Sequence, residues 1–180
     1  MYLLRSFSLS KWSPNLDKDL TNFETDPITV CTRTQANQLS VWQIESFDWN
    51  AELINKIIAA FALNKDNPAS LDFIFLDGDL LTQRGIEIVH NDADTPYADM
   101  NKYHKDLTAL TYETLGIVAN HIVDQLKDKA THKKIERAEL ISLVVDIYLA
   151  NNPKPFDIDT LPDKWKTAIT KECIKRNITL

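Results

Sequence analysis

Glycine is scarce in this chain: three residues in 180, where an average usage near 7% would give about 13. Neither the GxGxxG fingerprint nor the GxxxxGK[ST] loop occurs. Both motifs depend on glycines that let the backbone approach phosphate groups closely. The sequence therefore excludes the usual glycine-rich nucleotide-binding loops.

Cysteine and long apolar runs are also sparse. Cys31 and Cys173 are the only cysteines, too few for a disulfide-stapled scaffold. No apolar run reaches the roughly 18 residues that a membrane-spanning helix needs. The first residues alternate like a strand and lack the basic start and apolar core of a signal peptide. We therefore expect a reduced, cytoplasmic protein that does not bind membranes.

Negative charge is concentrated in one segment. The chain has 20 Lys and Arg against 26 Asp and Glu, a formal net charge of −6. Residues 66–99 hold one base, Arg84, and eight acids: Asp66, Asp72, Asp77, Asp79, Glu87, Asp92, Asp94 and Asp99. This segment therefore carries −7 and the rest of the chain +1. No strong basic stripe is present, which argues against nucleic-acid binding.

Alternating and β-branched runs in the first hundred residues predict an antiparallel sheet. Strands are expected at 2–9, 27–31, 39–44, 71–76 and 86–90. We expect one hairpin between the second and third of these strands, with its turn at 34–38, and another between the last two. Helical spacing of apolar residues predicts a short helix over 16–23 and an amphipathic helix over 49–63 that Asp48 caps.

Helical periodicity dominates the second half of the chain. Three consecutive helices are expected, one after Lys105, one over 135–150, and one that starts at a capping-box-like Thr160–Asp163 segment. Gly116 weakens the first of them, unless it permits a close crossing. Strands grouped before helices predict an α+β fold with about five strands. We expect one domain over 1–180, with a division near residue 100 as the alternative.

Four aspartates and two tryptophans are the candidate binding residues. Asp77, Asp79, Asp92 and Asp94 lie in the acidic segment, and Trp42 and Trp49 flank an acidic turn. Acidic surfaces attract basic partners, and Trp is enriched at binding hot spots, although core packing and solvation are the ordinary roles of these residues. We interpret the chain as a small non-enzymatic interaction or regulatory protein of the inhibitor or immunity type. It would face a basic protein partner and need no cofactor.

Two alternatives stay open. A divalent metal could bind Asp77, Asp79, His90, Asp92 and His104, and a metal-bound water would then serve a hydrolase, although no HExxH or EF-hand spacing supports it. A small molecule could instead occupy a pocket between the sheet and a central helix. The sequence assigns no catalytic residue and leaves open whether the protein is a monomer or a homodimer.

His121 is a further polar residue in an apolar setting. It flanks the apolar stripe of the helix that follows Lys105. A buried, hydrogen-bonded histidine is the expected role, and a general base is the alternative.

Overall fold

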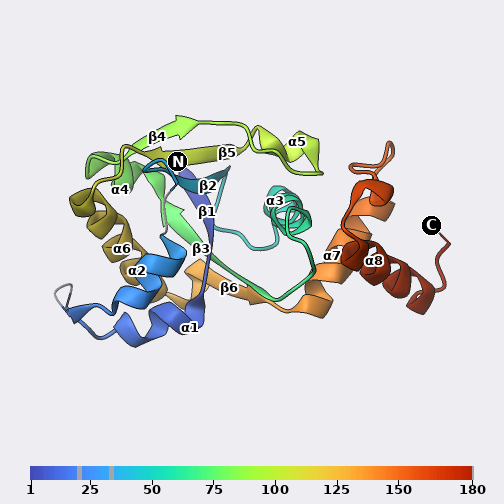
Figure 1. Ribbon diagram of the computed structural model, residues 1–180, viewed down its shortest axis with the longest axis horizontal. Coiled ribbons are helices and arrows are strands. Elements are labelled where there is room, and N and C mark those ends of the chain that lie inside the picture. The colour runs from blue at the N-terminus through green and yellow to red at the C-terminus, as the bar shows by residue number, and fades with distance from the viewer. Residues whose placement is uncertain (20–21, 33–34, 180) are drawn as a thin grey trace. The chain divides into compact units, whose positions relative to one another are not determined.

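The computed structural model describes residues 1–19, 22–32 and 35–179 (Figure 1). The chain divides into two compact units, each built from three separate segments. Unit 1 comprises Met1–Phe47, Leu71–Asn91 and His104–Lys134, and unit 2 comprises Asp48–Ser70, Asp92–Tyr103 and Ile135–Leu180. The chain passes from one unit to the other at five points, one of them between Tyr103 and His104. Whether the whole chain acts as a single domain stays a prediction.

The fold is α+β, as predicted, with a six-stranded antiparallel sheet instead of about five strands. The strands are β1 (Tyr2–Phe7), β2 (Leu39–Ile44), β3 (Leu71–Asp77), β4 (Glu87–His90), β5 (His104–Thr108) and β6 (His132–Ile135). Their order is β4-β5-β2-β1-β3-β6. β1 lies between β2 and β3, with Leu4 opposite both Trp42 and Phe75.

The hairpin predicted between residues 27–31 and 39–44 is wrong. Thr25–Cys31 form helix α2, because Pro27 lies in its first turn, where no backbone N–H is needed. The buried Arg5 guanidinium donates to the Cys31 carbonyl at the end of α2 (2.6 Å), and burial lowers the pKa of Arg5 to about 10. Gln35 and Gln38 pair across a tight turn before β2, while Thr34 of the predicted turn lies outside the described residues.

The second predicted hairpin is also wrong, because β3 and β4 are not neighbours in the sheet. β3 continues into helix α4 (Gly78–Gln83), and β4 pairs with β5 instead. Residues from Lys105 were expected to be helical, but they belong to β5. The helix α6 (Tyr112–Leu126) starts after this strand, at a capping box between Thr111 and Thr114.

The short helix predicted over 16–23 does not form in the described residues of that range, 16–19, 22 and 23, and two short helices come before it. Helix α1 (Leu9–Trp12) follows β1 directly, and the 3-10 helix η1 (Ser13–Asn15) follows α1. The Leu9 N–H donates to the Asp72 carboxylate (2.9 Å), a contact from a distant strand that satisfies the helix start. Leu20, which was part of the predicted helix, lies outside the described residues.

One face of the sheet packs against helices of unit 1. Alternate strand residues contribute to this core, and α6 supplies Val118, Ala119, Ile122, Val123 and Leu126. Figure 1 shows α6, α4, α2 and α1 in the same part of the molecule as the sheet. The short 3-10 helix η3 (Lys129–Thr131) connects α6 to β6. On the other face of the sheet Phe47 stacks on Phe75, with ring centroids 4.9 Å apart.

Unit 2 is helical. It contains α3 (Glu52–Leu63), α5 (Ala98–Asn101), α7 (Arg137–Ala150), the 3-10 helix η4 (Ile158–Thr160) and α8 (Asp163–Lys175). α3 packs on α5 and α7, and α7 packs on α8. The fully buried Trp165 donates its indole N–H to the Lys65 carbonyl (3.0 Å), which ties α8 to the end of α3.

Two helix starts in unit 2 differ from the prediction. α3 begins at Glu52, because the Asp48 carboxylate accepts from the Asn50 N–H (2.9 Å) in a turn that precedes the helix. The Thr160 hydroxyl donates to the Asp157 carbonyl (2.7 Å) within η4, so the predicted capping box does not form. Across the described ranges, no helix has the length and apolar character that crossing a bilayer requires.

Candidate functional site

Two of the four candidate aspartates support the local structure of unit 1. Asp77 ends β3 and caps α4, where its carboxylate accepts from the Leu80 N–H (3.0 Å). Asp79 forms an ion pair with the Met1 amino group. Asp72, another acid of the same segment, accepts from Leu9. These carboxylates have structural partners within unit 1, so each has fewer oxygen lone pairs free to accept hydrogen bonds from a binding partner.

The other two candidate aspartates, Asp92 and Asp94, are exposed residues of unit 2. The eight acids of residues 66–99 are in fact shared equally between the units. Unit 1 holds Asp72, Asp77, Asp79 and Glu87, and unit 2 holds Asp66, Asp92, Asp94 and Asp99. A segment that is continuous in sequence therefore does not form one continuous acidic surface within either unit.

The candidate metal ligands do not assemble into a binding site. His90 lies exposed on β4, 3.1 Å from the Lys105 amine. His104 is buried on β5, where its Nδ1–H donates to the Asn91 carbonyl (2.6 Å) and its ring lies edge-on to Trp42. Over residues 1–19, 22–32 and 35–179, no group of three or more His, Cys, Asp or Glu side chains could hold a metal ion. The metal-hydrolase alternative gains no geometric support from these residues.

The tryptophan candidates differ in exposure. Trp42 is 5% exposed and packs in the sheet, so it offers no binding platform on the surface. Trp49 is half-buried in unit 2. Both cysteines are free and buried, and burial raises the pKa of Cys173, which keeps that residue a protonated thiol.

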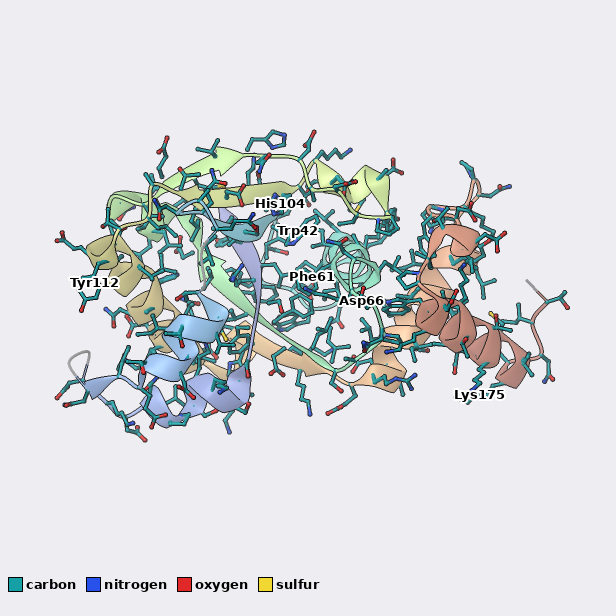
Figure 2. All side chains as sticks on the ribbon, in the orientation of Figure 1. Trp42, Phe61, Asp66, His104, Tyr112 and Lys175 are labelled. Atoms are coloured by element: carbon teal, nitrogen blue, oxygen red, sulfur yellow. The ribbon has the colours of Figure 1, made fainter. Side chains whose placement is uncertain are left out.

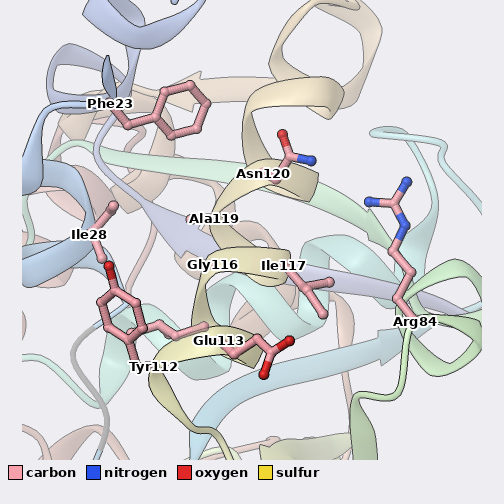
Figure 3. Close-up of a pocket in the computed structure, with 10 residues that line it drawn as sticks. Phe23, Ile28, Arg84, Tyr112, Glu113, Gly116, Ile117, Ala119 and Asn120 are labelled. Atoms are coloured by element: carbon pink, nitrogen blue, oxygen red, sulfur yellow. The ribbon is translucent and has the colours of Figure 1, made fainter. Parts of the chain in front are cut away.

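A groove lies on the outer side of α6 in unit 1 (Figure 3). Its volume is about 420 Å³, within the range of small-molecule pockets. Most of its lining is apolar, and the lining residues are Phe23, Ile28, Arg84, Tyr112, Glu113, Leu115, Gly116, Ile117, Ala119 and Asn120. The groove thus combines an apolar surface with a few polar groups.

The helical period explains why the groove follows α6. Glu113, Gly116, Ile117 and Asn120 recur at intervals of three or four residues, which places them on one face of the helix. A Cβ atom built on Gly116 would meet nothing within 4 Å, so this glycine opens the floor of the groove. The close helix crossing that the sequence allowed at Gly116 is absent.

The two sides of the groove differ in chemistry (Figure 3). Phe23 and Ile28, from the segment around α2, lie on one side of α6 together with Tyr112. Glu113, Asn120 and the Arg84 guanidinium lie on the other, together with the apolar Ile117. A molecule lying across Gly116 would therefore meet apolar side chains at one end and mainly polar ones at the other.

Arg84 carries the positive charge of this groove. Its backbone N–H is bonded to the Leu80 and Leu81 carbonyls (3.1 Å each) at the end of α4, which holds the residue in place. Within the described part of the chain, the guanidinium forms no hydrogen bond or ion pair, and neither does the Glu113 carboxylate. Both groups are available to a ligand.

His121 lies behind the groove, on the buried side of α6. Its Nε2 accepts from the Asp77 backbone N–H (3.0 Å), which places the ring proton of the neutral form on Nδ1. Nδ1 is buried and has no hydrogen-bond partner in the part of the chain that the structure describes. Burial lowers the pKa of His121, and the Arg84 charge lowers it further. The expected buried, hydrogen-bonded histidine is confirmed.

Comparison with protein-family models, with curated proteins and with solved structures found no match. Any function must therefore be argued from the residues and their geometry.

Sequence reasoning missed the groove, for a physical reason. Arg84 lies in the connection of the hairpin predicted between 71–76 and 86–90, Phe23 lies in a predicted helix and Ile28 in a predicted strand. None of these three predicted elements is present in the residues that the structure describes. Gly116 was the only signal, because a glycine inside a strong helical pattern weakens the helix and calls for an explanation.

Proposed function

We propose that this protein is a binding protein whose groove along α6 receives a small molecule with an apolar body and one anionic group. The observation that carries the proposal is the open, apolar floor at Gly116 beside the unpaired Arg84 guanidinium. An apolar body gains about 25 cal/mol for each Å² of apolar surface that it removes from water. An arginine fork matches carboxylate, sulfonate and phosphate geometry.

The charges at the polar side favour one anionic group over two. The Glu113 carboxylate lies on the same side of α6 as Arg84 and would repel a second negative charge. The Asn120 amide can donate or accept a hydrogen bond and therefore tolerates a neutral polar group. The groove would therefore prefer ligands with one anionic group, which Arg84 binds, over ligands with two, which Glu113 repels.

The test uses 8-anilinonaphthalene-1-sulfonate, which combines an apolar aromatic body with one sulfonate. We expect the folded protein to enhance its fluorescence at a single site. Gly116→Phe fills the groove floor and should abolish the enhancement. Gly116→Ala is the matched control, because one methyl group leaves most of the groove open and should preserve binding.

Arg84→Gln tests the anionic end of the ligand separately. It should weaken binding of the sulfonate dye about tenfold or more, since a charge-assisted hydrogen bond is lost. If the Gly116→Phe protein melts like the wild type and still binds the dye, the groove is not the binding site. Equal binding by Arg84→Gln and wild-type protein would refute the role of the guanidinium.

A second proposal retains the acidic segment as a surface for a basic protein partner. It is supported by the exposed Asp92, Asp94 and Asp99 of unit 2, which fall within eight residues of sequence. A lysine-rich peptide should bind with an affinity that falls steeply with salt. Asn substitutions at Asp92 and Asp94 should weaken this binding more than those at Asp77 and Asp79. Unchanged affinity after all four substitutions would exclude this proposal.

A further inference from the structure

A second cavity, in unit 2, has the opposite chemistry to the α6 groove. It measures about 410 Å³ and is lined by Asn67, Pro68, Arg137, Asp163, Lys164, Thr167, Ala168 and Lys171. The residues come from the segment after α3, the first turn of α7 and one face of α8. Lys164, Thr167, Ala168 and Lys171 recur at helical spacing, so α8 forms one wall.

Three solvent-exposed cations line this cavity against one exposed acid. The Arg137 Nε donates to the Pro68 carbonyl (3.2 Å), which orients the guanidinium, and none of the hydrogen bonds described in this part of the structure involves its two terminal nitrogens. Lys164 and Lys171 have no side-chain partner among the residues that the structure describes. The acid, Asp163, is 97% exposed, and its carboxylate lies 3.6 Å from the Lys166 amine. The cavity lining carries a net charge of +2.

Two of these cations occupy positions that helix electrostatics disfavours. Arg137 is the first residue of α7, and Lys164 is the second residue of α8. The helix dipole makes the first turn positive, so a cation there is repelled and an anion is stabilised. Local choices that oppose stability tend to mark functional positions. An anion bound between these two residues would offset the repulsion.

We infer that this cavity, here termed the unit 2 anion site, binds a small phosphorylated molecule. Three cations supply more charge than a single carboxylate can neutralise, whereas a phosphate or diphosphate group matches it. The Thr167 hydroxyl and the Asn67 amide add neutral donors at the same cavity. Unit 2 as a whole carries −3, which disfavours an extended nucleic-acid strand and favours a compact ligand.

The test is calorimetric titration of the full chain with inorganic pyrophosphate at low ionic strength. We expect one site per chain. Lys164→Gln and Lys171→Gln should each weaken binding about tenfold, since each removes a charge-assisted contact. Lys175→Gln is the matched control, because this lysine of α8, which Figure 2 labels, lies outside the cavity lining and pairs with Glu172. The control should bind within about twofold of the wild type.

Arg137→Gln is expected to have the largest effect, but it also removes the contact with Pro68. The two lysine variants therefore decide the outcome, and thermal melts must show that they fold. Absence of pyrophosphate binding would overturn the inference, and so would equal weakening by Lys175→Gln and Lys164→Gln. A mononucleotide that binds at the same site more tightly than inorganic phosphate would identify the ligand as a phosphate ester. Failure of this test leaves the groove in unit 1 unaffected.

Discussion

The two units of this protein carry the same formal charge but present different surfaces to ligands. Each unit contains 10 basic and 13 acidic residues and therefore carries −3. Unit 1 has a largely apolar groove with one unpaired arginine, and unit 2 has a polar cavity with three cations. The difference comes from the placement of a few side chains on helix faces. Net charge is thus a poor guide to ligand class here.

The largest expected effect concerns the core of unit 2. Trp165→Ala should lower the free energy of unfolding by about 3–5 kcal/mol in a urea titration, because it removes a fully buried indole. Trp165→Phe and Trp12→Phe form a matched pair between the units. The Trp165 variant leaves the Lys65 carbonyl without its donor, whereas the Trp12 indole nitrogen has no hydrogen-bond partner among the described residues. Equal costs for the two Phe variants would contradict the role of this hydrogen bond.

A smaller effect separates structural acids from solvent-exposed ones. Asp77→Ala should cost about 1 kcal/mol of stability, since the Asp77 carboxylate caps α4 in unit 1. Asp94→Ala in unit 2 should change stability very little, because this residue is exposed. Chemical denaturation of both variants provides the measurement. If Asp94→Ala lowers stability more than Asp77→Ala, Asp94 and not Asp77 would be the structural acid.

Gly116→Ala should stabilise unit 1 by roughly 0.5–1 kcal/mol, because alanine favours the helix and its methyl group meets no neighbour. Gly85→Ala is the contrasting variant. Gly85 has a φ of +87°, so a side chain there is strained and stability should fall. Thermal unfolding of both variants should therefore show shifts of opposite sign. A destabilised Gly116→Ala protein would mean that the groove floor is already filled.

The smallest expected effect is a pH dependence of unit 1. Burial and the Arg84 charge lower the pKa of His121, while Asp77 and Asp124 partly oppose the shift. The unfolded chain therefore binds a proton more readily than the folded protein. The stabilisation is complete above about pH 6.5 and declines as the pH falls below it. His121→Gln should flatten this slope, and exposed His90→Gln should not. An unchanged slope in His121→Gln would assign the effect to other groups.

Strands with strict alternation or β-branched runs could be predicted from sequence, as β1, β2, β3 and β4 show. The sequence pattern did not predict strands β5 and β6. β5 buries His104 and Asp106, and the Asp106 carboxylate is satisfied by Ser40 (3.2 Å) and Asn91 (2.6 Å). These partners are distant in sequence, so the local pattern of β5 appears polar. β6 contains Lys133 and Lys134 at the edge of the sheet, where lysines discourage further pairing and hide the strand pattern.

The candidate site was harder to predict than the fold. Continuous acidity in residues 66–99 suggests one surface, but the segment alternates between two units, and two of its carboxylates, Asp72 and Asp77, accept hydrogen bonds from backbone N–H groups. The residues that do line cavities are drawn from distant segments, as Phe23, Arg84 and Gly116 are. Only tertiary packing brings them together. Gly116 alone left a local trace in the sequence.

The central claim is that the units hold separate sites for different ligands. It is tested most directly by titrating the sulfonate dye and pyrophosphate into wild-type, Gly116→Phe and Lys164→Gln proteins. Our account predicts that Gly116→Phe loses only the dye and that Lys164→Gln loses only affinity for pyrophosphate. Loss of both ligands in either folded variant, or retention of both in both variants, would contradict it.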